Sequence, residues 1–372
     1  MIDLGIGEPN PSSLPLKELR QASAHRLGLQ DTSCLQYGPE EGSLSFREAL
    51  AGFLSRHYKS PVRAEELLIT AGASHALDLI LSRLCEPGDV VWIEDPTYFF
   101  ALDVFRDRDV RLVAILTDDQ GLDLQAVERR LAIGAPRLLY TIPVFHNPLG
   151  VTLSGLRRRR LLELARQQGF LVVADEVYQL TGDPLLTPPP LRTVDSEVVL
   201  SLGSFSKILG PGVRLGWIEG PPALLARLRD AGVLRSGGGV SPVMAAVLES
   251  AIRLGLQDAH LRRIRALYAR QRAHAMSLLR RSLPPEVRFT APDGGYYVWL
   301  VLPGHVDTTA LAEEAAKLGV AFRPGPVFLL QQRFANCLRL CFTYYDEATF
   351  TTAIERLAGL LRPLVSRELA HL

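Results

Sequence analysis

The segment Ser201–Trp217, SLGSFSKILGPGVRLGW, places one lysine, Lys207, between serines and glycines just after an apolar run. Lysine is rare in this chain, because only four of its 41 basic residues are lysines. Arginine stays protonated, whereas a desolvated lysine can lose its proton and act as a nucleophile. The choice of lysine here therefore favours an amine with a chemical role. A surface lysine that extends from a loop is the alternative.

The segment closes a series of short aliphatic runs that alternate with helical patterns between residues 65 and 220. The runs are ELLIT, VVWIE, RLVAIL, RLLYTI, FLVVADE, EVVLSLGS and VRLGWIEG. This alternation predicts a mainly parallel seven-stranded sheet with helices on both faces. In such sheets ligands bind beyond the carboxyl ends of the strands. The polar residues that follow these strands are therefore candidate site residues.

Two of these strand ends have groups suited to an anion. The glycine turn at residues 71–74 leads into a helix, whose free N–H groups attract phosphate, although such a turn is commonly only a cap. Ser204, Ser206 and Arg214 lie in the loop that holds Lys207. Hydroxyls and a guanidinium beside an amine predict an anion site next to a nucleophile.

Two further strand ends carry Asn147 and Asp175. Asn147 precedes a proline and could simply cap a turn. Asp175 directly follows a strand of buried type, where a carboxylate is costly unless it has a cationic partner or a ligand. Together the four strand ends call for one ligand with a phosphate, a protonatable ring nitrogen, a phenolic oxygen and an aldehyde. Pyridoxal 5'-phosphate has all four.

The motifs resemble those of the fold-type I, pyridoxal-phosphate-dependent aminotransferases of class I/II. The most specific are YGPEEGSLSFREAL, ADEVY, SFSK and GVRLGW. The sequence is most similar to the 2-aminoadipate and multi-substrate branch, which also includes the aminotransferase-like domain of MocR regulators. The resemblance implies an α/β fold, with a large sheet domain and a small C-terminal α/β domain.

The resemblance also implies roles at the cofactor. Lys207 would form the Schiff base and move the substrate α-proton, and Asp175 would pair with the ring nitrogen. Asn147 and Tyr178 would bind the phenolic oxygen, and Tyr98 would stack on the ring. The phosphate would be held by residues of three segments: Ala73, Ser74, Ser204, Ser206 and Arg214.

Substrate and subunit contacts follow from the same resemblance. Arg339 would bind the substrate α-carboxylate with its planar fork, beside Gly7 and Asn147. Tyr37 would reach the phosphate of a neighbouring subunit, which implies a homodimer. Arg323 stands where relatives usually have an apolar residue; it could offer a second cation to an acidic side chain or merely pair at the surface.

The domain organisation is predicted in three parts. Residues 1–30 would form an N-terminal segment that packs with the small domain, 31–265 the large cofactor domain, and 266–372 the small domain with its linking helix. The helical pattern of residues 241–281 predicts one long helix that bridges the domains.

Composition excludes several other classes. A net charge of +1 does not suggest nucleic-acid binding, and the arginine-rich runs at 157–160 and 262–265 are typical of solvated helix faces. No signal peptide or membrane span is evident, so a cytoplasmic protein is expected. The four scattered cysteines predict neither disulfides nor a metal site.

The predicted function is transfer of an amino group from an L-amino acid to a 2-oxo acid by a ping-pong mechanism. Neutral amino acids with 2-oxoglutarate as acceptor are expected, given Arg339 and the apolar surroundings expected from Tyr37, Tyr98 and Phe328. β-Lyase or other carbon-centred chemistry on the same cofactor is one alternative. A MocR-like ligand sensor is the second, and the lack of a DNA-binding segment in the sequence disfavours it.

Overall fold

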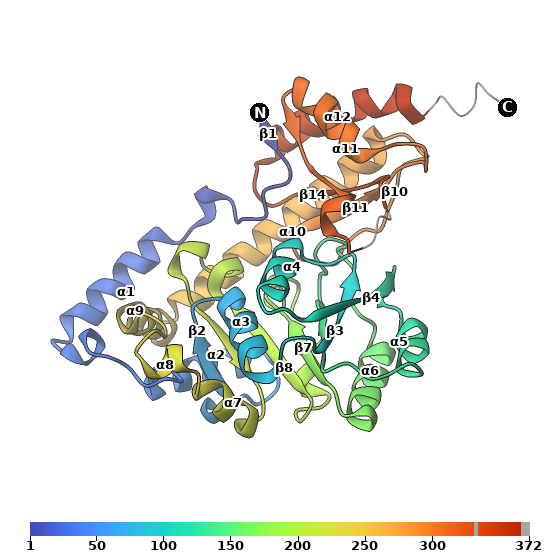
Figure 1. Ribbon diagram of the computed structural model, residues 1–372. Helices are drawn as coiled ribbons and strands as arrows, with labels where there is room; N and C mark the ends of the chain where they lie inside the picture. The colour runs from blue at the N-terminus through green and yellow to red at the C-terminus, as the bar shows by residue number, and fades with distance from the viewer. Residues whose placement is uncertain (331–333, 366–372) are drawn as a thin grey trace.

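The computed structural model describes residues 1–330 and 334–365, which form a large unit and a smaller one (Figure 1). The large unit is built on one sheet of order β2-β9-β8-β7-β6-β3-β4-β5. Its strands are β2 (Leu67–Thr70), β3 (Val90–Asp95), β4 (Arg111–Asp118), β5 (Gly121–Leu122), β6 (Leu138–Thr141), β7 (Leu171–Asp175), β8 (Val199–Ser204) and β9 (Gly216–Glu219).

Strand direction follows the sequence prediction. Neighbours from β8 through β7, β6 and β3 to β4 are parallel, and β9 runs antiparallel to both β8 and β2. All seven predicted strands are present, and β5 adds a two-residue antiparallel strand at the edge. The parallel strands therefore place their carboxyl ends along one edge of the sheet.

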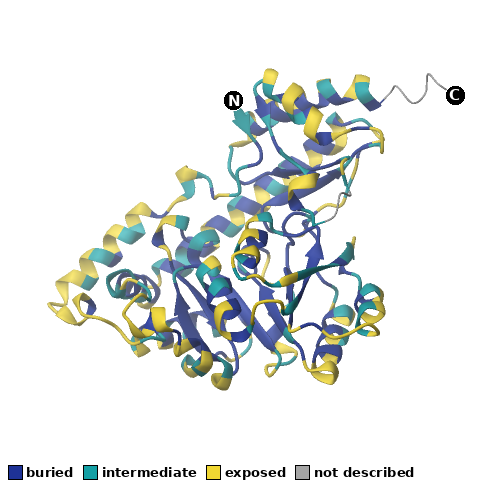
Figure 2. Ribbon diagram, in the orientation of Figure 1, coloured by how far each residue is buried: buried dark blue, intermediate teal, exposed yellow. Residues whose placement is uncertain are grey.

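Helices cover both faces of the large sheet, because successive strand residues point to opposite sides and both sides are apolar. One face packs against α3 (Ala73–Leu84), α4 (Phe99–Arg106), α7 (Pro222–Arg229) and α8 (Gly232–Arg235). The other packs against α2 (Leu44–Tyr58), α5 (Leu124–Leu131), α6 (Gly155–Gln168) and α9 (Pro242–Arg253). Figure 2 accordingly shows buried strands between helices whose outer faces are exposed.

The prediction of a single bridging helix over residues 241–281 is wrong in one respect. The segment forms two helices, α9 and α10 (Leu256–Ser282), with Gly255 between them at φ 70°. Glycine adopts this left-handed conformation without steric cost, so the helical path breaks there. The bridging role belongs to α10 alone: Leu261 and Ile264 pack in the core of the large unit, and Leu278 and Leu279 in that of the small unit.

The small unit has an antiparallel sheet of order β10-β11-β14-β13. Its strands are β10 (Arg288–Phe289), β11 (Tyr297–Val301), β13 (Arg323–Pro324) and β14 (Cys337–Cys341), and its helices are α11 (Thr308–Lys317) and α12 (Glu347–Val365). After β10 the chain runs through β11, α11, β13, β14 and α12 in that order. Near residue 320 the chain also forms β12 (Val320–Ala321), which pairs with β1 (Ile2–Asp3) at the N-terminus.

The N-terminal segment contacts both units. β1 joins the small unit through β12, whereas α1 (Leu16–Gly28) packs against α9 and α10 of the long connection. The proposed boundaries at residues 30 and 265 stay a prediction, and the second of them falls inside α10.

One arginine departs from the expected solvated face. Arg158 is buried, and its guanidinium donates hydrogen bonds to the carbonyl oxygens of Leu153, Pro143 and Pro189. These carbonyls lie in loops outside the regular strands and helices, so a buried arginine serves there as a multiple donor. In the part of the chain that the structure describes, no helix is both long enough and apolar enough to cross a bilayer.

Gly203 on β8 provides a test of the packing. It lies opposite Trp217, and a Cβ at this position would come within 2.0 Å of the buried indole. We expect Gly203→Ala to lower the free energy of unfolding in urea by about 1–3 kcal/mol through overpacking. Gly232→Ala, where a Cβ would meet nothing within 4 Å, is the matched control. Equal effects of the two changes would contradict this packing.

Candidate active site

The structure brings twelve of the thirteen predicted site residues to one cavity of about 650 Å³, a size typical of small-molecule sites. The cavity lies beyond the carboxyl ends of the parallel strands, where the small unit and the N-terminal segment face the large sheet. The twelve are Gly7, Ala73, Ser74, Tyr98, Asn147, Asp175, Tyr178, Ser204, Ser206, Lys207, Arg214 and Arg339.

One end of the cavity is suited to a phosphate. Helix α3 begins here at Ala73, and the first N–H groups of a helix have no partner within it. The Ser204 Oγ lies 3.0 Å from the Ser206 Oγ, so two hydroxyls face the same end. Arg214, with a left-handed φ of 47°, donates from Nη2 to the Ala71 carbonyl oxygen at 2.9 Å. Gly72 has a φ of 94°, which favours glycine, and a Cβ there would lie 2.9 Å from that Nη2.

Asp175 ends β7 with 8% of its surface exposed. The Tyr140 hydroxyl donates to its Oδ2 at 2.6 Å. Burial raises the pKa of Asp175, and the hydrogen bond from Tyr140 opposes that shift. Among the described residues this carboxylate has no salt-bridge partner, so it fits a cationic group of a ligand, such as a protonated ring nitrogen.

Tyr140 was missed by the sequence reasoning. Its signal was a tyrosine inside an otherwise aliphatic strand, RLLYTI, next to the strand that ends in Asp175. Because a buried phenol needs a hydrogen-bond partner, such a tyrosine indicates an acceptor on a neighbouring strand.

Lys207 is half-buried at the floor of the cavity. Its Nζ donates to the Gly7 carbonyl oxygen at 2.7 Å and lies 5.6 Å from the centre of the Tyr178 ring. Burial lowers the pKa of the Lys207 amine to about 8, and the nearby charge of Arg339 acts in the same direction. A substantial fraction of the amine is therefore neutral near physiological pH, as a nucleophile or base requires.

Arg339, in β14, is held in a fixed orientation. Nη1 donates to Asn147 Oδ1 at 2.7 Å, Nη2 donates to the Gly5 carbonyl oxygen at 2.8 Å, and the guanidinium lies 4.0 Å from the centre of the Tyr297 ring. Its buried Nε has no hydrogen-bond partner. No carboxylate among the described residues pairs with it, so its charge is available to an anionic substrate group.

The aromatic surroundings differ in part from the prediction. Phe328 packs with its ring centre 4.9 Å from the Arg339 guanidinium and is not among the residues that line the cavity. The apolar lining comes from Tyr98 and from residues that the sequence reasoning did not select: Phe99, Phe100, Ile142, Val177, Tyr297 and Val327.

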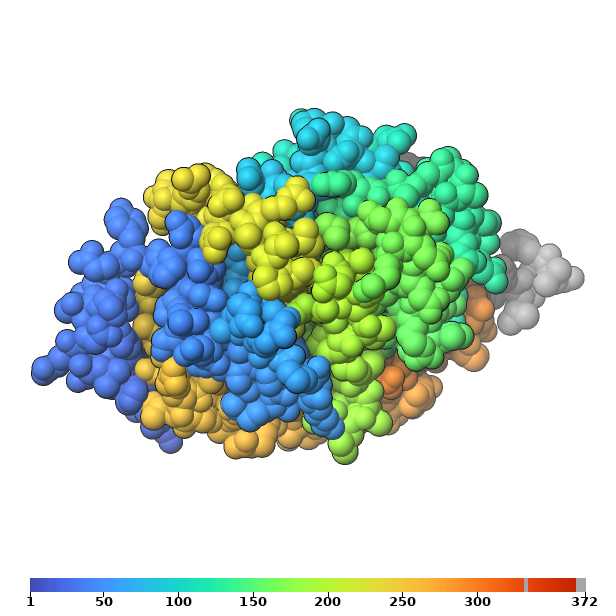
Figure 3. All heavy atoms as spheres, turned by 90° about the horizontal axis from the view of Figure 1, so that it is seen from below, coloured from blue at the N-terminus to red at the C-terminus, as the bar shows by residue number. Residues whose placement is uncertain are grey.

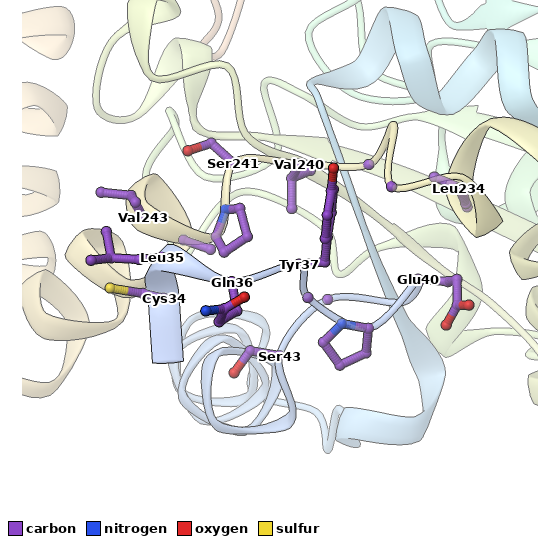
Figure 4. A pocket seen from close by; sticks show the side chains of 17 residues that line it. Cys34, Leu35, Gln36, Tyr37, Glu40, Ser43, Leu234, Val240, Ser241 and Val243 are labelled. Carbon is purple, nitrogen blue, oxygen red and sulfur yellow. The ribbon is translucent and has the colours of Figure 1, made fainter. Parts of the chain in front are cut away.

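Tyr37 is the one predicted site residue outside this cavity. Its side chain is 87% exposed and lines a second pocket, formed by residues 34–43 and by the segment between α8 and α9. Figure 4 shows Tyr37 standing beside Val240 in that pocket. Seen from below, the blue N-terminal part of the chain adjoins the yellow segment that contains α8 (Figure 3).

The main cavity fits pyridoxal phosphate on three independent features: an anion cradle, a buried carboxylate without a salt bridge in the described part of the chain, and an amine of lowered pKa. When bound, this cofactor supplies an aldehyde that accepts an amine and a ring that accepts electrons. The fold and the site together define a pyridoxal-phosphate-dependent enzyme of fold type I.

Comparison with known proteins is consistent with this class. The family model of aminotransferase class I and II matches residues 1–357. The chain is 35% identical to aromatic-amino-acid aminotransferase 1 of Thermococcus litoralis, over 97% of this chain and 88% of that protein. This chain belongs to the class I and II aminotransferases, and it uses pyridoxal phosphate.

Two solved structures are similar in fold. The multiple substrate aminotransferase of Thermococcus profundus has a TM-score of 0.91 and 33% identity, covering 98% of this chain and 92% of that one. The α-aminoadipate aminotransferase of Thermus thermophilus, complexed with N-(5'-phosphopyridoxyl)-L-leucine, has a TM-score of 0.89 and 31% identity, covering 99% and 93%.

The lowered pKa of Lys207 is testable by competitive labelling of the cofactor-free protein with acetic anhydride. With a pKa of about 8, roughly one tenth of the Lys207 amine is neutral at pH 7 and most of it at pH 9. The labelling of Lys207, measured by mass spectrometry, should rise by up to tenfold between pH 7 and pH 9 and then level off. This profile should be the same at every reagent concentration. Lys317, whose pKa is raised by its hydrogen bond to Glu314, is the internal control and should still rise above pH 9. Parallel profiles for the two lysines would contradict the assignment.

Proposed function

We propose that this aminotransferase takes its amino group from neutral L-amino acids and passes it to 2-oxoglutarate as the usual acceptor, with both half-reactions at the Lys207 cavity. The observation that carries the proposal is the placement of the Lys207 amine and the Arg339 guanidinium on one cavity with a mostly apolar remainder. The names of the similar proteins, which include an aromatic-amino-acid and a multiple substrate enzyme, support a broad donor range.

Arg339 would bind the substrate α-carboxylate, because its fork is held by Asn147 and Gly5 and no carboxylate in residues 1–330 and 334–365 pairs with it. The substrate Cα would then face Lys207. When the substrate binds, the Lys207 amine would give up its hydrogen bond to the Gly7 carbonyl oxygen. It would then remove the substrate α-proton as a base and return a proton as an acid.

The other residues would act on the cofactor. Asp175 would keep the ring nitrogen protonated, with Tyr140 fixing the carboxylate. Tyr98 would cover one face of the ring. Tyr178, whose hydroxyl donates to the Tyr297 hydroxyl at 3.2 Å, and Asn147 would face the phenolic oxygen. The cradle residues Ala73, Ser74, Ser204, Ser206 and Arg214 would hold the phosphate.

The donor range and the chemistry are tested together by adding single amino acids to the loaded enzyme. The visible absorption of the cofactor should change with many neutral amino acids, and each should yield its own 2-oxo acid. Adding 2-oxoglutarate should restore the spectrum and form glutamate over many cycles. Lys207→Ala should lower kcat by at least about 1000-fold, since it removes the nucleophile and the base together.

Three outcomes would contradict the proposal. Spectral change only with small hydroxy or thio amino acids, accompanied by pyruvate and ammonia, would identify a β-lyase. Binding of amino acids without any turnover would identify a ligand sensor. Equal turnover by the wild type and Lys207→Ala would remove Lys207 from the chemistry.

A homodimer is the second part of the proposal. Large apolar side chains are exposed on and beside α1, including Leu16 at 79%, Leu27 at 63% and Leu35 at 67%. Leu35 lines the pocket that holds Tyr37, so this surface would both join two copies and bring Tyr37 to the neighbouring phosphate.

A cytoplasmic location is also inferred, and the four free cysteines are in keeping with a reducing compartment.

Subunit complementation tests the placement of Tyr37. Tyr37→Phe should weaken cofactor binding by about tenfold, because a hydrogen bond to a charged group is lost. Tyr37→Ala and Lys207→Ala should each be impaired alone. Co-expressed, the two variants should regain activity, since the mixed dimer holds one site with Lys207 from one chain and Tyr37 from the other. No recovery in a purified mixed dimer would show that Tyr37 serves its own chain or neither.

A further inference from the structure

Arg323 is a second guanidinium at the Arg339 side of the cavity. It lies in β13, directly opposite Arg339 of β14, and both side chains line the cavity. Side chains of directly opposed residues in an antiparallel pair lie on the same face of a sheet, with Cβ atoms about 5 Å apart. The two cations therefore project side by side from one sheet.

Gly5 lies between the two guanidinium groups. Its carbonyl oxygen accepts a hydrogen bond from Arg339 Nη2, and a Cβ at Gly5 would lie 3.1 Å from the Arg323 Cζ. The N-terminal segment at Gly5 thus fixes the spacing of the two charged groups, and both remain in reach of one ligand that enters the cavity.

Among the described residues, the two guanidinium groups at this corner have one salt-bridged carboxylate between them, that of Asp3. Asp3 is the only salt-bridge partner of Arg323 among the described residues, and its Oδ2 lies 3.6 Å from Arg323 Nη2, longer than a hydrogen bond. Asp3 is already engaged, because its Oδ1 accepts the Gly5 N–H at 2.7 Å. Arg323 keeps 39% of its side chain exposed, so its N–H donors are open to another anion.

We propose that Arg323 binds the distal carboxylate of dicarboxylic substrates, while Arg339 binds the carboxylate next to the reacting carbon. This inference rests on the proposed function and names the residue that recognises the acidic substrate. Two like charges on neighbouring strands repel each other, and a substrate with a carboxylate at each end relieves that repulsion. The class comprises 2-oxo and 2-amino dicarboxylic acids, with 2-oxoglutarate among them.

The same corner is compatible with neutral substrates. When the substrate has no distal charge, Asp3 would remain beside Arg323. The substrate's side chain would then contact the apolar lining from Phe99, Phe100 and Val327. Arg323 would thus let one cavity take a neutral donor in one half-reaction and an acidic acceptor in the other.

The test compares two acids of equal length, glutarate and pentanoate, as ligands of the loaded enzyme in titration calorimetry. The wild type should bind glutarate about 10- to 100-fold more tightly than pentanoate, as expected for a charged hydrogen-bonded group. Arg323→Gln should abolish the preference, and Arg323→Lys should keep part of it. Asp3→Asn, which retains the oxygen that accepts the Gly5 N–H, should increase the preference for glutarate over pentanoate.

Kinetics give a second readout. In Arg323→Gln the ratio of kcat/KM for 2-oxoglutarate to that for 2-oxopentanoate should fall by about 10- to 100-fold, in line with the binding preference. A preference for glutarate that survives in Arg323→Gln would overturn the inference, as would an equal loss for both acids, since Arg323 would then only support the N-terminal segment. A glutarate preference that follows Arg323 without any amino-group transfer would instead overturn the proposed function alone.

Discussion

The site depends on one constraint of the parallel sheet: strands that run in the same direction end on the same edge. β6, β7 and β8 are parallel neighbours; Asp175 ends β7, and the loops that follow β6 and β8 supply Asn147 and Lys207. The topology of the sheet therefore brings groups that lie far apart in the sequence to one cavity, and no contact with a ligand is needed for this. The costly features of the site, a buried carboxylate and a desolvated amine, can persist because the rigid sheet core holds them in place.

Most of the large sheet could be predicted because its strands are short, aliphatic and bounded by turns. The site residues could be predicted because strand-end polar groups in apolar surroundings need partners, and because the motifs resemble a known family. The break at Gly255 was missed, since a lone glycine within a helical pattern does not say whether the helix bends, continues or ends. The buried Arg158 was missed for a similar reason: its partners are loop carbonyls that only the tertiary structure brings together.

Other features are beyond local sequence reasoning because they arise from long-range contacts. Tyr140 and Tyr297 look like ordinary core aromatics until the strands place them beside Asp175 and Arg339. The left-handed conformations of Arg214 and Phe145 have no local signal, because neither residue type favours them. Arg214 lines the cavity and Phe145 lies two residues before Asn147, which lines it; such backbone strain is commonly found near functional sites, where the surrounding packing sustains it.

The continuity of helix α10 has a consequence for how the protein unfolds. Its first half contributes to the core of the large unit and its second half to that of the small unit, with no loop between them. Because the two cores share this continuous helix, we expect the unfolding of the two units to be coupled. A gene cut at the middle of this helix would leave each fragment with the half of α10 that packs in its own core, but it would separate β1 from its partner strand β12.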